Sequence, residues 1–167
     1  VELGHFALIL AFAVALVQST LPLYGAWARD SRLMALAEPA ALIQLILIAA
    51  AFGALTYAFV VSDFSLRLVT LNSHTDKPML YKVSGVWGNH EGSLLLWALS
   101  LALFGACAVW FGDNLPATLK ARVLAIQGMI GAAFLAFMLF TSNPFLRLAM
   151  PPMNGDDLNP LLQDPGL

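Results

Sequence analysis

Long apolar segments alternate with short polar segments along this chain, and this pattern indicates its fold class. Each apolar segment is almost free of charged residues and is long enough to cross the hydrocarbon core of a bilayer, about 30 Å, as a helix. The pattern therefore predicts an all-α membrane protein with about four transmembrane helices. The spans are expected at about residues 4–27, 39–61, 93–111 and 122–142.

The polar segments between the spans differ in length. Residues 28–38 and 112–121 form short connectors, whereas residues 62–92 form a long loop between the second and third spans. Within this loop the stretch FSLRLVTL fits both the alternation of a strand and the spacing of a helix. Its secondary structure stays open, and we expect an element that lies on the membrane. A polar tail, residues 143–167, follows the fourth span.

Basic residues indicate how the bundle is oriented. Arg29, Arg32, Lys120 and Arg122 are concentrated around the two short connectors, whereas the same number of basic residues is spread over much longer polar segments elsewhere. Cytoplasmic loops of membrane proteins are enriched in lysine and arginine. The short connectors are therefore expected in the cytoplasm, and the N-terminus, the long loop and the tail are expected to face outward.

Composition agrees with a membrane protein and argues against several other classes. Of the 167 residues, 60% are hydrophobic and 11% are charged, whereas soluble domains are about 25% charged. A net charge of −2 gives no sign of nucleic-acid binding. The single cysteine, Cys107, cannot form a disulfide or a C-x-x-C pair within this chain. His5, His74 and His90 are too scattered for a zinc site, so no metal site is expected.

Two features inside the spans predict close helix packing. Small residues recur four positions apart in every span, which lets helix backbones approach each other. Gln18, Gln44 and Gln127 are expected at similar depth, where they could hydrogen-bond across the bundle. Acidic and basic side chains are absent from the middle of the spans, which argues against an ion-coupled transporter. The rows of small residues are Ala7, Ala11 and Ala15; Ala49 and Gly53; Ala98, Ala102 and Ala106; and Gly128, Ala132 and Ala136.

The stretch SGVWGNHEGSLLLW, residues 84–97, joins the long loop to the third span. Its three glycines allow a tight fold that would bring Trp87, His90 and Glu91 together. Ordinary roles explain part of this pattern, because Asn89 is a good helix N-cap and an acidic residue suits the first turn of a helix. Interfacial tryptophans and solvated loop histidines are also common. The three side chains are nevertheless candidates for a functional site.

Four blocks of sequence resemble the amino-terminal part of the CcmF family of the cytochrome c maturation system. They read VWGNHEGSLLLW at 86–97, ARVLAIQGMIG at 121–131, FTSNPF at 140–145 and DLNPLLQDPGL at 157–167. The resemblance implies a component of the membrane haem lyase in the bacterial inner membrane, with functional loops in the periplasm. Such a component receives haem from a periplasmic haem chaperone and supports the addition of haem vinyl groups to the C-x-x-C-H thiols of apocytochrome c.

The resemblance also implies a cofactor and partners. The complete protein or complex is expected to hold haem b and to contact the remaining haem-lyase polypeptide or subunits and thiol-reducing maturation proteins. Candidate residues near haem or a partner are Trp87, His90 and Glu91 in the first block and Asn159 and Asp164 in the last. His90 matches a position of the family's HEGS motif, and we expect it to have a docking or supporting role.

The tryptophan-rich WWD motif of the family is absent from this sequence. The catalytic residues and haem ligands are therefore expected on the remainder of a larger protein or on another subunit. Residues 1–167 are expected to form one transmembrane helical module of such a protein or complex. Two other functions stay open at this point, namely a haem-transporting module and a purely structural membrane subunit.

Overall fold

The computed structural model describes residues 1–156, which form four long and three short α-helices. The long helices are α1 (Glu2–Ala28), α3 (Ala37–Val60), α6 (His90–Phe111) and α7 (Ala117–Phe140). The short helices are α2 (Ser31–Met34), α4 (Arg67–Asn72) and α5 (Met79–Ser84). Each long helix is long and apolar enough to cross a membrane. The prediction of an all-α protein with four spans is confirmed.

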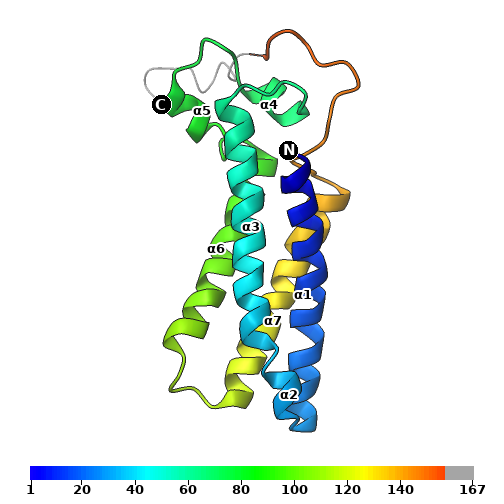
Figure 1. The fold of residues 1–167 in the computed structure, drawn as a ribbon, viewed down its shortest axis with the longest axis vertical. Helices are drawn as coiled ribbons and strands as arrows, with labels where there is room; N and C mark the ends of the chain where they lie inside the picture. The colour runs from blue at the N-terminus through cyan, green and yellow to red at the C-terminus, as the bar shows by residue number, and fades with distance from the viewer. Residues whose placement is uncertain (157–167) are drawn as a thin grey trace.

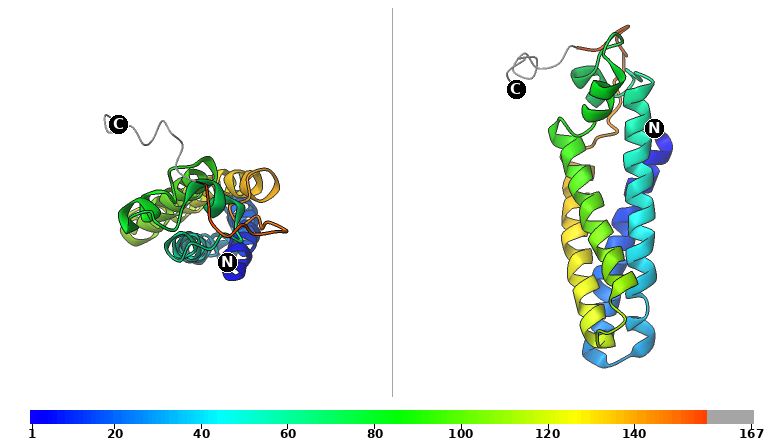
Figure 2. Two further views of the ribbon diagram at one scale, coloured as in Figure 1. Left: turned by 90° about the horizontal axis from the view of Figure 1, so that it is seen from above. Right: turned by 90° about the vertical axis from the view of Figure 1, so that its left-hand side faces the viewer.

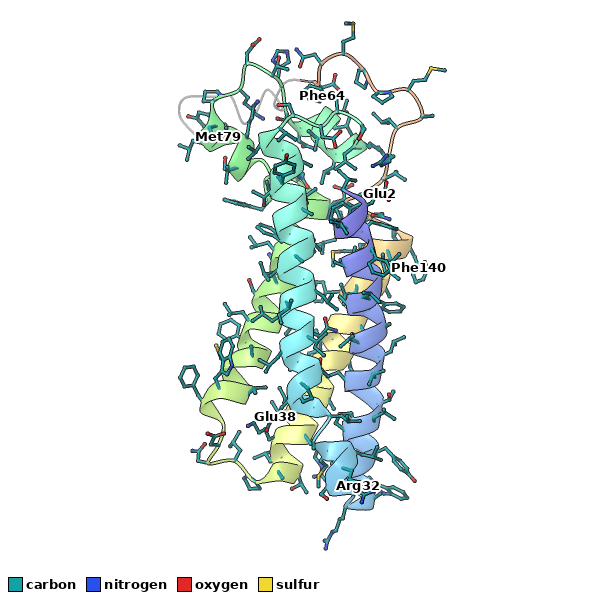
Figure 3. All side chains as sticks on the ribbon, in the orientation of Figure 1. Glu2, Arg32, Glu38, Phe64, Met79 and Phe140 are labelled. Atoms are coloured by element: carbon teal, nitrogen blue, oxygen red, sulfur yellow. The ribbon has the colours of Figure 1, made fainter. Side chains whose placement is uncertain are left out.

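The long helices run side by side as an elongated bundle (Figure 1). The N-terminus, α4 and α5 lie at one end, which we call the loop end. The short helix α2 and the link between α6 and α7 lie at the opposite end, which we call the connector end (Figure 2). Arg32 extends from the connector end, whereas Glu2 and Phe64 belong to the loop end (Figure 3).

All four long helices begin earlier than the hydrophobic pattern predicted, and the difference is largest for α6 and α7. Helix α6 begins at His90 rather than at about residue 93, because Asn89 caps it and the polar motif becomes its first turn. Helix α7 begins at Ala117 rather than at about residue 122. Its first turns therefore contain Lys120, a polar residue that the sequence pattern had placed in the connector.

The FSLRLVTL stretch, which fitted both a strand and a helix, contains one β-bridge residue followed by a short helix. Leu66 forms an isolated antiparallel bridge with Arg147, and helix α4 begins at the next residue, Arg67. The bridge is the one β contact that the structure records within residues 1–156. This stretch therefore attaches the long loop to the segment that follows α7.

The core of the bundle takes side chains from all four long helices. Leu8, Leu55, Leu95 and Leu135, one from each long helix, are fully buried and belong to one hydrophobic cluster. Between helices in lipid, such contacts stabilise the bundle mainly by van der Waals packing, because lipid tails are as apolar as leucine. Close packing of α1 against α7 is visible at Gly128, where an added Cβ would lie 3.0 Å from Cγ of Gln18.

The predicted rows of small residues are buried in α1 and α6 but not in α3. In α3, Ala49 and Gly53 are exposed, and a Cβ added at Gly53 would meet nothing within 4 Å. The buried small residues of α3 are instead Ala37, Ala40, Ala41, Ala51 and Ala58. The prediction was wrong for α3 because this helix is apolar on all sides, so its sequence does not mark the inner face.

The glutamines do hydrogen-bond across the bundle. Nε2 of Gln18 in α1 donates to the Gln127 side chain at 2.6 Å and to the Leu124 carbonyl at 2.8 Å, both in α7. Nε2 of Gln44 in α3 donates separately to the Ala11 carbonyl of α1 at 2.8 Å. The predicted hydrogen bonding across the bundle is therefore confirmed for all three glutamines, and Gln44 uses a backbone acceptor of α1.

Candidate functional site

The turn between α5 and α6 is organised by the side chain of Asn89. Its Oδ1 accepts a hydrogen bond from the Gly92 amide at 2.7 Å, which is the geometry of a helix N-cap. Its Nδ2 donates to the carbonyl oxygens of Gly85 at 2.8 Å and Val86 at 3.2 Å. One amide side chain thus ties the end of the turn to the start of the membrane helix, so the turn has a defined shape.

Gly92 is required by close packing rather than by its backbone angles. A Cβ at this position would overlap the carbonyl oxygen of Val86, and Val86 itself is fully buried. Within residues 1–156 every glycine has an ordinary negative φ. The glycines therefore allow the tight fold without unusual backbone angles, and at Gly92 the turn is tight because two backbone segments touch.

The side chains of Trp87, His90 and Glu91 have different surroundings. Trp87 remains 42% exposed in the turn. The His90 ring meets the Phe137 ring of α7 edge-on, with centroids 6.2 Å apart. Glu91 is half-buried and lines a small pocket. Neither Trp87 nor His90 lines this pocket. The three residues are neighbours in the turn but do not share that pocket.

The pocket has a volume of about 80 Å³ and lies where α4, the first turn of α6 and the end of α7 meet. Its polar lining includes Arg67 and Asn72 of α4, Glu91 of α6, and Ser142 and Asn143 after α7. In the described part of the chain, neither the Arg67 guanidinium nor the Glu91 carboxylate forms an ion pair. The pocket therefore presents one positive and one negative group that are free to contact a ligand or a partner.

Residues 141–156, which we call the tail segment, supply one side of the pocket through residues 141–143 and Leu146, and backbone hydrogen bonds attach this segment to α4 and to the residues before it. The Arg67 amide donates to the Leu146 carbonyl at 2.9 Å, and the Leu148 amide donates to the Ser65 carbonyl at 2.9 Å. Farther along, the Asp156 amide donates to the Thr70 carbonyl at 2.7 Å. These bonds join segments that are distant in sequence, so the pocket forms only when the tail segment has folded onto α4.

The three histidines lie on different elements and have different partners. Nδ1 of His5 lies 3.4 Å from the Asn143 amide nitrogen, and Nε2 of His74 lies 2.8 Å from the Asn154 amide nitrogen. His90 contacts Phe137. Residues 1–156 contain no cluster of three or more histidine, cysteine or acidic side chains suited to a metal ion.

Sequence reasoning identified Glu91 but missed its neighbours. Arg67 belongs to the stretch of undecided secondary structure, and Asn143 was interpreted only as the end of the fourth span. The FTSNPF block was a signal for Asn143, although nothing in the sequence linked this block to Glu91. Asn159 and Asp164, the other candidates, lie outside the described residues.

Comparisons with known proteins agree on one family. The family model described as Cytochrome C assembly protein matches residues 87–167, starting at Trp87. The chain is 71% identical over 167 residues to the cytochrome c-type biogenesis protein ccl1 of Rhodobacter capsulatus, covering 100% of this chain and 26% of that protein. It is 47% identical over 167 residues to the cytochrome c-type biogenesis protein CcmF of Escherichia coli, covering 99% and 26%.

A solved structure has the same arrangement of helices. The structure named Cytochrome c Heme Lyase CcmF matches with a TM-score of 0.81 and 31% sequence identity, over 86% of this chain and 24% of that one. The chain thus spans about a quarter of the length of the curated relatives that it matches.

Proposed function

Because the chain belongs to the CcmF family of cytochrome c-type biogenesis proteins, we propose that it is the amino-terminal membrane part of a cytochrome c haem lyase component. The observation that carries this proposal is sequence similarity along the whole chain, including the SGVWGNHEGSLLLW stretch. In the complete protein or complex, this part supports the covalent attachment of haem to apocytochrome c. The haem vinyl groups add to the two thiols of a C-x-x-C-H segment and form thioether bonds.

The loop end is the part that we assign to this task. The haem vinyl groups and the thiols must be oriented toward each other while both are in the reactive redox state. Asn89 and Gly92 give the turn a defined shape, and Trp87 presents an exposed aromatic surface beside it. The pocket lined by Arg67 and Glu91 adds charged groups for recognition. We propose that this surface contacts haem, the haem chaperone, apocytochrome c, thiol-reducing maturation proteins or the remaining haem-lyase polypeptide.

The described residues do not provide the ligands of an embedded haem b. Such a haem needs axial ligands, commonly histidines, held at fixed geometry. His5 and His74 each contact an asparagine amide, and the rings of the three histidines do not contact one another. These residues do not fit the group, so we place the haem ligands and the catalytic residues on the rest of the protein or complex.

We further propose that the chain crosses a bacterial inner membrane with its loop end in the periplasm. The connector end carries Arg29, Arg32 and Arg122 on exposed positions, which agrees with the enrichment of basic residues on the cytoplasmic side. Labelling of single cysteines with a membrane-impermeant reagent tests this orientation, and the labelled positions must be exposed, which excludes Ser73 of the long loop because it is fully buried. Single cysteines should instead replace exposed residues, after removal of Cys107.

The orientation predicts a specific labelling pattern. In intact spheroplasts, a membrane-impermeant thiol reagent should label cysteines at Leu80 and Met153 but should label those at Arg32 and Ala117 only after lysis. The opposite labelling pattern would show that the loop end faces the cytoplasm. It would leave the family assignment untouched, because that assignment rests on sequence similarity.

The functional test compares one residue of the turn and one of the pocket with exposed residues that belong to neither. In the complete protein, Trp87→Ala or Glu91→Gln should lower the yield of mature cytochrome c at least severalfold while the level of the variant protein stays unchanged. Trp110→Ala and Glu2→Gln are matched controls, since both residues are exposed and lie outside the turn and the pocket. If the yield falls only as far as the level of the protein falls, the turn has a structural role alone.

A further inference from the structure

An open groove of about 580 Å³ lies between α1 and α7 toward the connector end. Its volume is in the range of small-molecule sites, about 300–1,000 Å³. Leu23 and Met129 give it an apolar floor, and Tyr24, Trp27 and Arg122 also line it. The groove is separate from the turn and the pocket at the loop end, and the haem-lyase proposal assigns no role to it.

The groove runs parallel to the helix axes. Helices α1 and α7 are antiparallel, and Gly128 of α7 packs against Gln18 and Ser19 of α1. From this register, Trp27 and Arg122 lie at the connector end of the groove, and Met129 lies toward the middle of the bilayer. Seven residues separate Arg122 from Met129, which corresponds to about 10 Å along a helix. One end of the groove is thus suited to a head group, and the rest is suited to an acyl chain.

The polar groups at the connector end of the groove are available for a ligand. Within residues 1–156, the Arg122 guanidinium, the Tyr24 hydroxyl and the Trp27 indole N–H form no hydrogen bond or ion pair. The Tyr24 and Trp27 rings lie 5.8 Å apart. In contrast, the Thr20 hydroxyl, at the deeper end of the groove, donates to the Leu16 carbonyl at 2.7 Å. The residues that carry unpaired donors therefore line the end of the groove at which a phosphate is expected.

Charge at the connector end favours an anionic ligand. Lys120 is paired with Glu38 at 2.8 Å and with Asp113 at 3.7 Å, so these acidic groups are engaged with a buried lysine. In the described part of the chain, Arg122 has no such acidic partner. Basic pockets between transmembrane helices bind anionic lipid head groups.

We propose that this groove binds one anionic phospholipid of the surrounding leaflet. Arg122, Tyr24 and Trp27 contact its phosphate and glycerol region, and one acyl chain lies along Leu23 and Met129. Aromatic and arginine side chains that only anchor a helix at the interface would not distinguish one lipid from another. Selectivity for an anionic head group is therefore the property to measure.

The experiment is a lipid titration on the complete protein in detergent, followed by native mass spectrometry. Phosphatidylglycerol should bind more tightly than phosphatidylcholine, and Arg122→Gln should weaken phosphatidylglycerol binding about fivefold. Arg122→Lys should retain most of the affinity because it keeps the charge. Arg32→Gln is the control, since Arg32 is exposed at the same end but does not line the groove. Glycerol phosphate, a soluble head group, should not compete.

Three outcomes would overturn the proposal. Equal binding of the two lipids, or an equal loss in Arg32→Gln and Arg122→Gln, would show that the groove does not select the head group. Competition by glycerol phosphate would identify a phosphate site without an acyl chain. A photo-crosslinker at Leu23 provides a test that does not depend on the arginine variants. It should capture phospholipid, and capture of protein alone would show that a helix fills the groove.

Discussion

The connector end and the loop end of the bundle are held together by different kinds of contact. At the connector end, the Lys120 ammonium lies 2.8 Å from Glu38, 3.7 Å from Asp113 and 3.2 Å from the Val109 carbonyl, so one side chain joins α3, α6 and α7. The Lys120 side chain is only 10% exposed. At the loop end the buried lysine is Lys82, which donates to the Ser62 hydroxyl at 2.7 Å and forms no ion pair within the described residues.

At the loop end, contacts join segments that are far apart in the chain. Glu2 and Arg147 form an ion pair at 2.7 Å, but their side chains are 76% and 53% exposed. The backbone bridge of Leu66 to Arg147 and the packing of Gly92 on Val86 are better shielded from water, because Leu66 and Val86 are fully buried. The connector end is thus centred on a buried, ion-paired lysine, whereas the long-range contacts of the loop end are made mainly by its backbone.

The largest effect is expected for Gly92→Ala. The new methyl group would overlap the Val86 carbonyl, and the backbone on both sides is held by the Asn89 side chain. We expect a loss of about 3 kcal/mol or more in stability, because backbone cannot move aside as a flexible side chain can. Protein level in the membrane and proteolysis of the loop end would measure it.

Gly53→Ala is the matched control for this substitution. Gly53 also lies in a membrane helix, but an added Cβ would meet nothing within 4 Å. Alanine should be neutral or should stabilise the helix by up to about 1 kcal/mol. If the two variants behaved alike, close backbone approach at Gly92 would not be what shapes the turn.

An intermediate effect is expected for Lys120→Met at the connector end. The substitution removes the ammonium that pairs with Glu38 and the donor to the Val109 carbonyl. Thermal unfolding in detergent should show a loss of about 2 kcal/mol, the scale of a hydrogen bond to a charged group. Cytochrome c yield per molecule of folded protein should stay constant, since the loop end is untouched. A selective loss of yield would show that the two ends are coupled.

The smallest effect is expected for Glu2→Gln or Arg147→Gln. Both side chains are largely exposed, and exposed ion pairs contribute less than about 1 kcal/mol. The backbone bridge to Leu66 would remain in both variants. A double-mutant cycle on unfolding measures the coupling, which should also weaken at high salt. A coupling well above 1 kcal/mol would show that this pair, rather than the backbone, holds the loop end.

Local features of the candidate site were predictable from the sequence, whereas its long-range contacts were not. Asn89 was identified as the N-cap of α6 because a cap needs only residues within one turn of each other. Arg67 and Glu91 line one pocket in a loop end where the tail segment bonds to α4, and these bonds join residues about half the length of the chain apart. The FSLRLVTL stretch stayed undecided for the same reason, since its partner residue is Arg147.

The sequence by itself determined the number of spans, because long uncharged segments have few other stable conformations than a helix in a bilayer. It also determined which loops share an end, since four crossings alternate sides. Only the tertiary structure decided which helix faces point inward, as Ala49 and Gly53 of α3 illustrate. In lipid, a helix that is apolar all round has no polar side to expose to water, so packing against its neighbours, rather than hydrophobicity, selects the buried face.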